Sequence, residues 1–141
     1  MLVRACAALL SLLPLGAANA GAQLALSAIV AKTAQVSVRD QPASIEVSDA
    51  DVARGYVDVP VGPRVDVTTN SREGLIVTFV AGGDAFRAVQ LRGTAGDSIV
   101  LAGPSRGVAT HRIEPAYRLM LAPGARPGTH AWPVQVIATA L

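Results

Sequence analysis

Apolar and polar residues alternate along much of the chain, beginning with the stretch GAQLALSAIVAKTAQVSV at residues 21–38. From Leu24 to Val38 the even positions are apolar except at Lys32, and many odd positions are polar. A period of two is typical of a β-strand with one buried face. Because such a strand would span roughly 50 Å, much more than most strands, we expect it to bend at Lys32 or to leave its first half protruding.

Shorter alternating runs follow, separated by turns that contain glycine or proline. They predict strands at residues 44–47, 56–61, 64–68, 75–80, 86–91, 98–101, 117–121 and 132–140. In the strand at 56–61, Val57, Val59 and Val61 are expected on one face. Ser48 as N-cap and Gly55 as stop predict a helix of one or two turns between them. Residues 102–115 are the least regular and predict a long loop or an irregular edge.

This pattern predicts an all-β fold, an immunoglobulin-like antiparallel β-sandwich of about seven to nine strands. The spacing of the strands does not distinguish two packed sheets from one closed sheet. The few aromatic residues fall at strand positions, and we expect them in the core or at its margin.

The first 20 residues have the layout of a secretory signal peptide, with Arg4 before an apolar run and the triplet Ala18-Asn19-Ala20 after it. The apolar run is too short for a membrane anchor, and Pro14 interrupts it. We therefore expect cleavage before Gly21, export to the periplasm or cell surface, and no membrane insertion afterwards. Residues 21–141 are expected to form a single domain.

Composition excludes several classes of function for the exported part. The only cysteine, Cys6, lies in the predicted leader, which leaves no thiol for disulfides or redox chemistry. Without Arg4, the remaining chain has 11 basic and 10 acidic residues, and its arginines are scattered. Nucleic-acid binding needs a concentrated basic surface, so we expect no nucleic-acid partner.

Candidate chemistry is sparse. His111, His130 and Met120 are types of residue that suit copper, but they lie on different predicted elements, and structural roles are favoured for all three. The sequence contains no HExxH, EF-hand, paired CxxC or GxSxG motif. We expect no catalytic residues, no metal site and no cofactor, and hence a protein that is not an enzyme.

Two segments resemble a known family. LSAIVAKTAQVSV is similar to the opening strand of spore coat U and related archaic chaperone-usher fimbrial subunits, with Ala34 at about the place where those proteins have a cysteine. YRLMLAPGARPGTHAWPVQVIATAL is similar to their closing hairpin. The resemblance implies an incomplete sandwich that binds the N-terminal extension of the next subunit as its missing strand.

On this resemblance, the donor-strand candidates are Leu24, Leu26, Ala28 and Val30, and Lys32 marks the junction with the subunit's own first strand. The expected function is a non-enzymatic subunit or accessory component of a surface fimbria, in which alternate side chains of an added strand fill pockets in the acceptor. Its expected partners are further copies, other fimbrial subunits and a periplasmic chaperone. One alternative keeps residues 24–38 as the protein's own first strand, which switches sheets at Lys32 or continues unbroken. The protein would then be a self-contained periplasmic β-sandwich that binds a protein partner or a metal.

Overall fold

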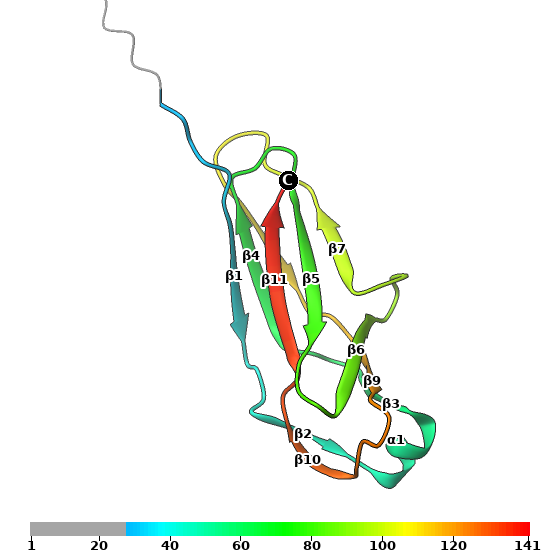
Figure 1. Ribbon diagram of the computed structural model, residues 1–141. Coiled ribbons are helices and arrows are strands. Elements are labelled where there is room, and N and C mark those ends of the chain that lie inside the picture. The colour runs from blue at the N-terminus through cyan, green and yellow to red at the C-terminus, as the bar shows by residue number, and fades with distance from the viewer. Residues whose placement is uncertain (1–27) are drawn as a thin grey trace, which may run out of the picture.

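The computed structural model describes residues 28–141; the predicted leader, Leu24 and Leu26 lie outside this range. The described residues form β1 (Ala34–Arg39), β2 (Ser44–Val47), α1 (Asp49–Arg54), β3 (Tyr56–Val59), β4 (Arg64–Thr69), β5 (Leu75–Ala81), β6 (Phe86–Leu91), β7 (Ser98–Leu101), β8 (Ala109–Ile113), β9 (Tyr117–Leu121), β10 (Gly128–Ala131) and β11 (Val134–Ala140) (Figure 1). The fold is therefore almost entirely β.

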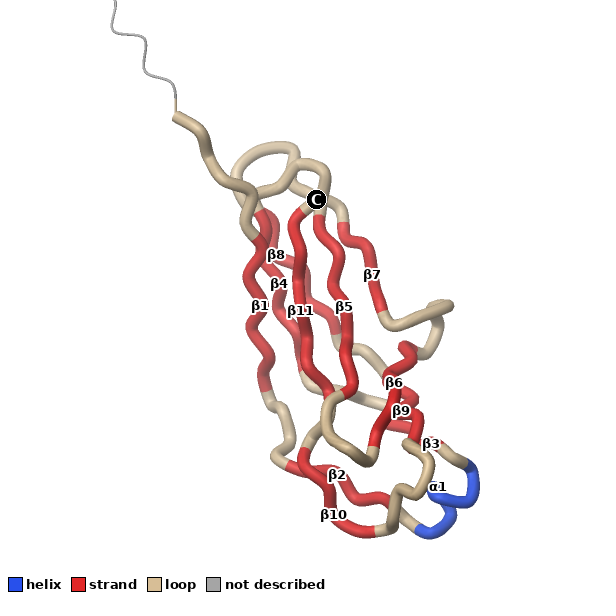
Figure 2. Tube along the Cα trace, viewed as in Figure 1, coloured by secondary structure: helices blue, strands red, loops and turns tan. Residues whose placement is uncertain are grey.

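The strands form four small sheets, and all pairings between them are antiparallel. In one half of the molecule, sheet β1-β4-β8 packs against sheet β11-β5-β7 (Figure 2). The other half contains sheet β3-β9-β6 and the pair β10-β2, with α1 beside them. This arrangement confirms the predicted all-β antiparallel sandwich.

The prediction of seven to nine strands is wrong, because the described residues form 11. The two strands that the sequence does not predict are β8 and β10. Pro60 and Pro63 separate β3 from β4, and Pro133 lies between β10 and β11. Proline lacks the backbone donor that a strand ladder needs. The first strand changes sheets at residues 40–43, where Asp40 has a φ of 58°, and not at Lys32.

Several segments differ in extent or regularity from the predicted elements. Residues 102–115 contain the regular strand β8, which pairs with β4 and forms the edge of its sheet. The strand predicted at 56–61 ends at Val59, so Val61 leaves the core face and is 75% exposed. The extended run of residues 24–38 begins its strand only at Ala34, and the described residues before it protrude.

The core joins both halves of the molecule. Val65 and Val67 from β4 and Leu75 and Val77 from β5 are completely buried. Tyr117 is also buried, with its ring 5.6 Å from Phe79 and 6.1 Å from Trp132 between centroids, and burial raises the pKa of its phenol well above the ordinary value. Phe79, Phe86, Tyr117 and Trp132 thus lie in the core or at its margin, as predicted. Tyr56 lies outside this cluster, with the Arg118 guanidinium 4.1 Å from its ring centroid.

The helix α1 begins and ends where its capping residues predict. The Ser48 hydroxyl accepts a hydrogen bond from the Asp51 backbone N–H, and the Asp51 carboxylate accepts one from the Ser48 N–H at 3.0 Å. This reciprocal pair is a capping box. Gly55 ends the helix with a φ of 80°, a left-handed conformation that glycine adopts without strain.

Candidate functional site

Residues 28–33, the described part of the N-terminal segment, leave the sandwich at one end (Figure 1). Of the donor-strand candidates, Ala28 and Val30 are described and Leu24 and Leu26 are not. Val30 is 77% exposed and its neighbour Ile29 is 98% exposed. Residues 28–33 belong to none of the strands, and Figure 1 shows this part of the chain pointing away from the sandwich. An apolar stretch that packs on nothing in its own described domain is typical of a segment that binds a partner.

Strand β11 has one long edge without a hydrogen-bonded neighbour among the described residues. It pairs with β5 along its whole length, from Val134 opposite Ala81 to Ala140 opposite Leu75, and it is the outermost strand of its sheet. Its sequence, VQVIATA, contains no charged residue, proline or glycine. Edge strands are usually protected by such residues, by bulges or by shortness. An edge of seven uncharged residues is instead a template on which another strand can pair.

Strand β1 lies beside this edge. Cα atoms of the two strands lie within 8 Å of each other, but no strand pairing joins their described residues. Their inward-facing side chains contact the core and are only partly buried: Val36, Val38, Val136 and Ala138. By contrast, Val67 and Val77 on the adjacent inner strands are 0% exposed. The core is therefore incompletely covered along β1 and β11.

The opposite side of the sandwich differs. There the edge strands are β7 and β8, and the loop after β7 reaches across to β8. Nε2 of His111 on β8 donates a hydrogen bond to the carbonyl oxygen of Ala102 at 2.8 Å. β8 also carries the charged residue Arg112. This bridge and this charge make the β7–β8 side a poorer template for strand pairing than the β11 edge.

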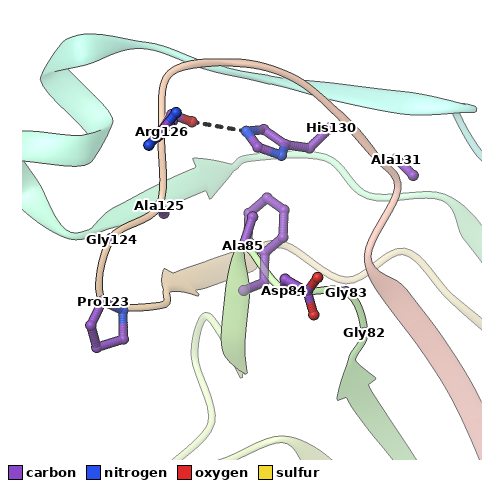
Figure 3. A pocket seen from close by; sticks show the side chains of 11 residues that line it. Gly82, Gly83, Asp84, Ala85, Pro123, Gly124, Ala125, Arg126, His130 and Ala131 are labelled. Carbon is purple, nitrogen blue, oxygen red and sulfur yellow. Dashed lines mark hydrogen bonds between the residues drawn. The ribbon is translucent and has the colours of Figure 1, made fainter.

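A cavity of about 590 Å³ lies in the other half of the molecule, between the loop at residues 82–85 and the loop at residues 123–126 (Figure 3). Phe86 forms part of its wall and meets the His130 ring edge to face at 5.9 Å. Its ionisable side chains are Asp84, Arg126 and His130, and Nε2 of His130 donates to the Arg126 carbonyl oxygen at 2.9 Å. The described lining includes no hydroxyl or thiol that a histidine could activate.

The structure does not bring the imagined copper ligands into one site. His111 lies on β8, Met120 on β9 and His130 on β10, which belong to three different sheets. Nε2 of both His111 and His130 donates a hydrogen bond to a backbone carbonyl oxygen. Within residues 28–141 no group of three or more His, Cys, Asp or Glu residues is arranged to hold a metal ion.

The comparisons give no relatives: no protein-family model, curated protein or solved structure matches this chain. No helix among the described residues is long and apolar enough to span a membrane. The candidate site therefore rests on the geometry of β1, β11 and the N-terminal segment. The alternation in residues 132–140 predicts β11 itself, but not its open edge, because pairing depends on residues distant in the sequence.

Proposed function

We propose that this protein is an exported structural subunit that assembles by β-strand addition. Residues 24–30 of one copy pair with the open edge of β11 in the next copy. β1 and β11 have Cα atoms within 8 Å of each other, so β1 of the acceptor must move aside to admit a strand that needs about 4.8 Å on each side. The observation that carries this proposal is the edge of β11, which is uncharged and unpaired among the described residues. The apolar, alternating N-terminal segment of the same chain has Ile29 and Val30 exposed. Backbone hydrogen bonds supply much of the affinity of such pairing, and alternate side chains supply its specificity.

The two strands match in length and in pattern. Residues 24–30 number seven, as do those of β11, so the added strand would cover the whole edge at about 3.3 Å per residue. Its even-numbered residues, Leu24, Leu26, Ala28 and Val30, would turn towards the core between the partly buried side chains of β1 and β11. Full burial of a leucine or valine side chain stabilises by about 1.5–3 kcal/mol. The two leucines are therefore expected to contribute most.

The first experiment compares a form spanning residues 21–141 with a form that begins at Lys32. Size-exclusion chromatography and unboiled denaturing gels measure the size of each. We expect the longer form to give a ladder of stable multimers. The shorter form keeps β1 and all later strands, so it is expected to remain a folded monomer that lacks only the donated strand.

A matched pair of variants tests which face of the segment is used. Ala28→Asp with Val30→Asp places two charges on the inward face and is expected to abolish the ladder. Ser27→Asp with Ile29→Asp places the same charges on the other face and is expected to retain it. If the longer form is instead a monomer and truncation unfolds it, the segment stabilises its own domain. The protein is then a self-contained β-sandwich, and the cavity at Phe86 becomes the first place to look for a ligand.

A further inference from the structure

The turn between β4 and β5 holds the N-terminal segment where it joins β1. Oδ1 of Asn70 accepts a hydrogen bond from the Thr33 backbone N–H at 2.7 Å, and Nδ2 of Asn70 donates to the Ala31 carbonyl oxygen at 2.9 Å. The Thr69 hydroxyl adds a bond to the Thr33 carbonyl oxygen at 2.8 Å. Thr69, the last residue of β4, and Asn70 of the turn thus engage three backbone groups of residues 31–33.

The two bonds of Asn70 require an extended backbone at Lys32. In an extended chain, the C=O of one residue and the N–H of the second residue after it point to the same side, and the Asn70 amide contacts these two groups of Ala31 and Thr33. The Asn70 side chain therefore forms the two hydrogen bonds that a neighbouring strand would otherwise form with Ala31 and Thr33. A reverse turn at residues 31–33 would break this pattern.

The Lys32 side chain also forms an ion pair with Glu73 of the same turn. Both side chains are more than half exposed, at 54% and 67%. Exposed ion pairs are typically worth only about 0–1 kcal/mol. Asn70 and Thr69, rather than this ion pair, are therefore expected to hold the segment.

The turn is itself fixed to the end of β11. Thr69 and Ser71 are each 1% exposed, and the Thr69 hydroxyl accepts a bond from the Ser71 N–H at 3.0 Å. The Ser71 hydroxyl donates to the Leu141 carbonyl oxygen, and the Leu141 N–H donates to the Gly74 carbonyl oxygen at 2.9 Å. Residues 31–33 and the last residue after β11 are thus fastened to the same turn, which sets the direction of the segment relative to the β11 edge.

This direction keeps the segment away from its own acceptor. β1 starts, and β11 ends, at the same end of the sandwich (Figure 1). To lie along β11 of its own chain, the segment would have to reverse at residues 31–33. Tight reversals favour Gly, Asn, Asp or Pro, and Ala31-Lys32-Thr33 contains none of them.

We infer that the β4–β5 turn, chiefly through Asn70, acts as a clasp that directs the N-terminal segment away from its own β11 edge and reserves it for a second copy of the chain. The inference rests on the proposed strand addition for its biological meaning, whereas the clasp itself is measurable in a single molecule. It explains how an apolar strand and an open edge on one chain avoid pairing with each other.

The test measures the position of the segment within one molecule. Spin labels are attached at Ile29→Cys and Ile137→Cys in the full chain with Cys6→Ser; both label sites are more than half exposed, at 98% and 51%. Labelled protein is diluted into unlabelled protein so that electron–electron distances report on single chains. We expect one long, narrow distance distribution. In Asn70→Ala, the distance between the two labels is expected to have a broad distribution that extends to shorter values.

Two further variants keep the result interpretable. Glu73→Ala removes only the exposed ion pair and is expected to retain the narrow distribution. Lys32→Asn with Thr33→Gly supplies a reverse-turn sequence and is expected to shift the distribution to short distances. A broad or short distribution in the parent protein, or no change in Asn70→Ala, would overturn the clasp. Multimers of unlabelled protein are scored separately: a narrow distance without multimers supports the clasp and contradicts strand addition.

Discussion

At the scale of single residues, Gly62 shows how tightly the core fixes the chain between β3 and β4. A methyl group at this position would lie 2.3 Å from Cε2 of Tyr117 and 2.6 Å from the Pro115 carbonyl oxygen. The Gly62 N–H also donates to that oxygen at 2.9 Å, so the backbone has little room to retreat. We expect Gly62→Ala to lower the free energy of unfolding by about 1–3 kcal/mol, the usual effect of overpacking a core.

Urea denaturation of the residue 21–141 form would measure this effect, and Gly96→Ala is the matched control. A methyl group at Gly96 meets nothing within 4 Å, so this substitution is expected to leave stability unchanged or to raise it by about 0.4–1 kcal/mol through the unfolded state. Equal urea midpoints for the two variants would contradict the expectation that Tyr117 and Pro115 leave no space for a methyl group at Gly62.

At the scale of elements, the sequence predicts those that carry their own local signals. The Ser48 cap and Gly55 stop define α1, and the alternation of Val65 and Val67 with polar residues defines β4. The sequence predicts a loop or irregular edge at β8, because the central inward position of this strand is the polar His111. The regularity of β8 comes from its pairing with β4. β10 was missed because it has only four residues, and its sequence, GTHA, has no apolar alternation.

The parts of the candidate site likewise differ in whether the local sequence predicts them. The even-numbered apolar residues of the N-terminal segment are visible in the sequence because their signal is local. The clasp is not, since Asn70 lies 37 positions after Thr33 and the TTNSREG stretch reads only as a turn. The open edge of β11 also depends on which strands pair across the whole chain. Local periodicity therefore predicts the proposed donor segment, whereas tertiary pairing determines which edge of the sandwich stays open.

The two edges of sheet β11-β5-β7 make a matched test of the acceptor. Ile137 on β11 is 51% exposed and Val100 on β7 is 69% exposed, so a lysine at either position is expected to leave the fold intact. A lysine on an edge strand disfavours pairing with a further strand. We expect Ile137→Lys to weaken the multimer ladder on unboiled gels and Val100→Lys to preserve it. The reverse outcome would place the acceptor on the β7 side.

At the scale of the whole molecule, stability and assembly are expected to respond differently to pH. Three carboxyl groups have pKa values below the ordinary range: Asp51 through hydrogen bonds from Ser48, Asp58 through Arg118, and Asp66 through Arg112. A lowered folded-state pKa contributes stability that is fully present above the unfolded value of about 3.9 and is lost as pH falls through the folded value. Thermal unfolding temperatures are therefore expected to be steady above about pH 5 and to fall in more acidic solution.

The proposed interface contains no group that titrates in this way. Neither residues 24–30 nor β11 includes an ionisable side chain, and the nearby inward-facing residues of β1, Val36 and Val38, are apolar. Apolar contacts and backbone hydrogen bonds are little affected by salt. Electrostatic interactions between exposed charges are screened over a Debye length of about 3 Å at 1 M ionic strength. We therefore expect the multimer distribution on size-exclusion chromatography to be unchanged between about pH 5 and 8 and between roughly 0.05 and 1 M salt. Multimers that dissociate in high salt while the domain stays folded would indicate association through charged surfaces. One such surface is the cluster of Arg39, Asp66 and Arg112 on the outer face of β1-β4-β8. That outcome would exclude strand addition as the main contact.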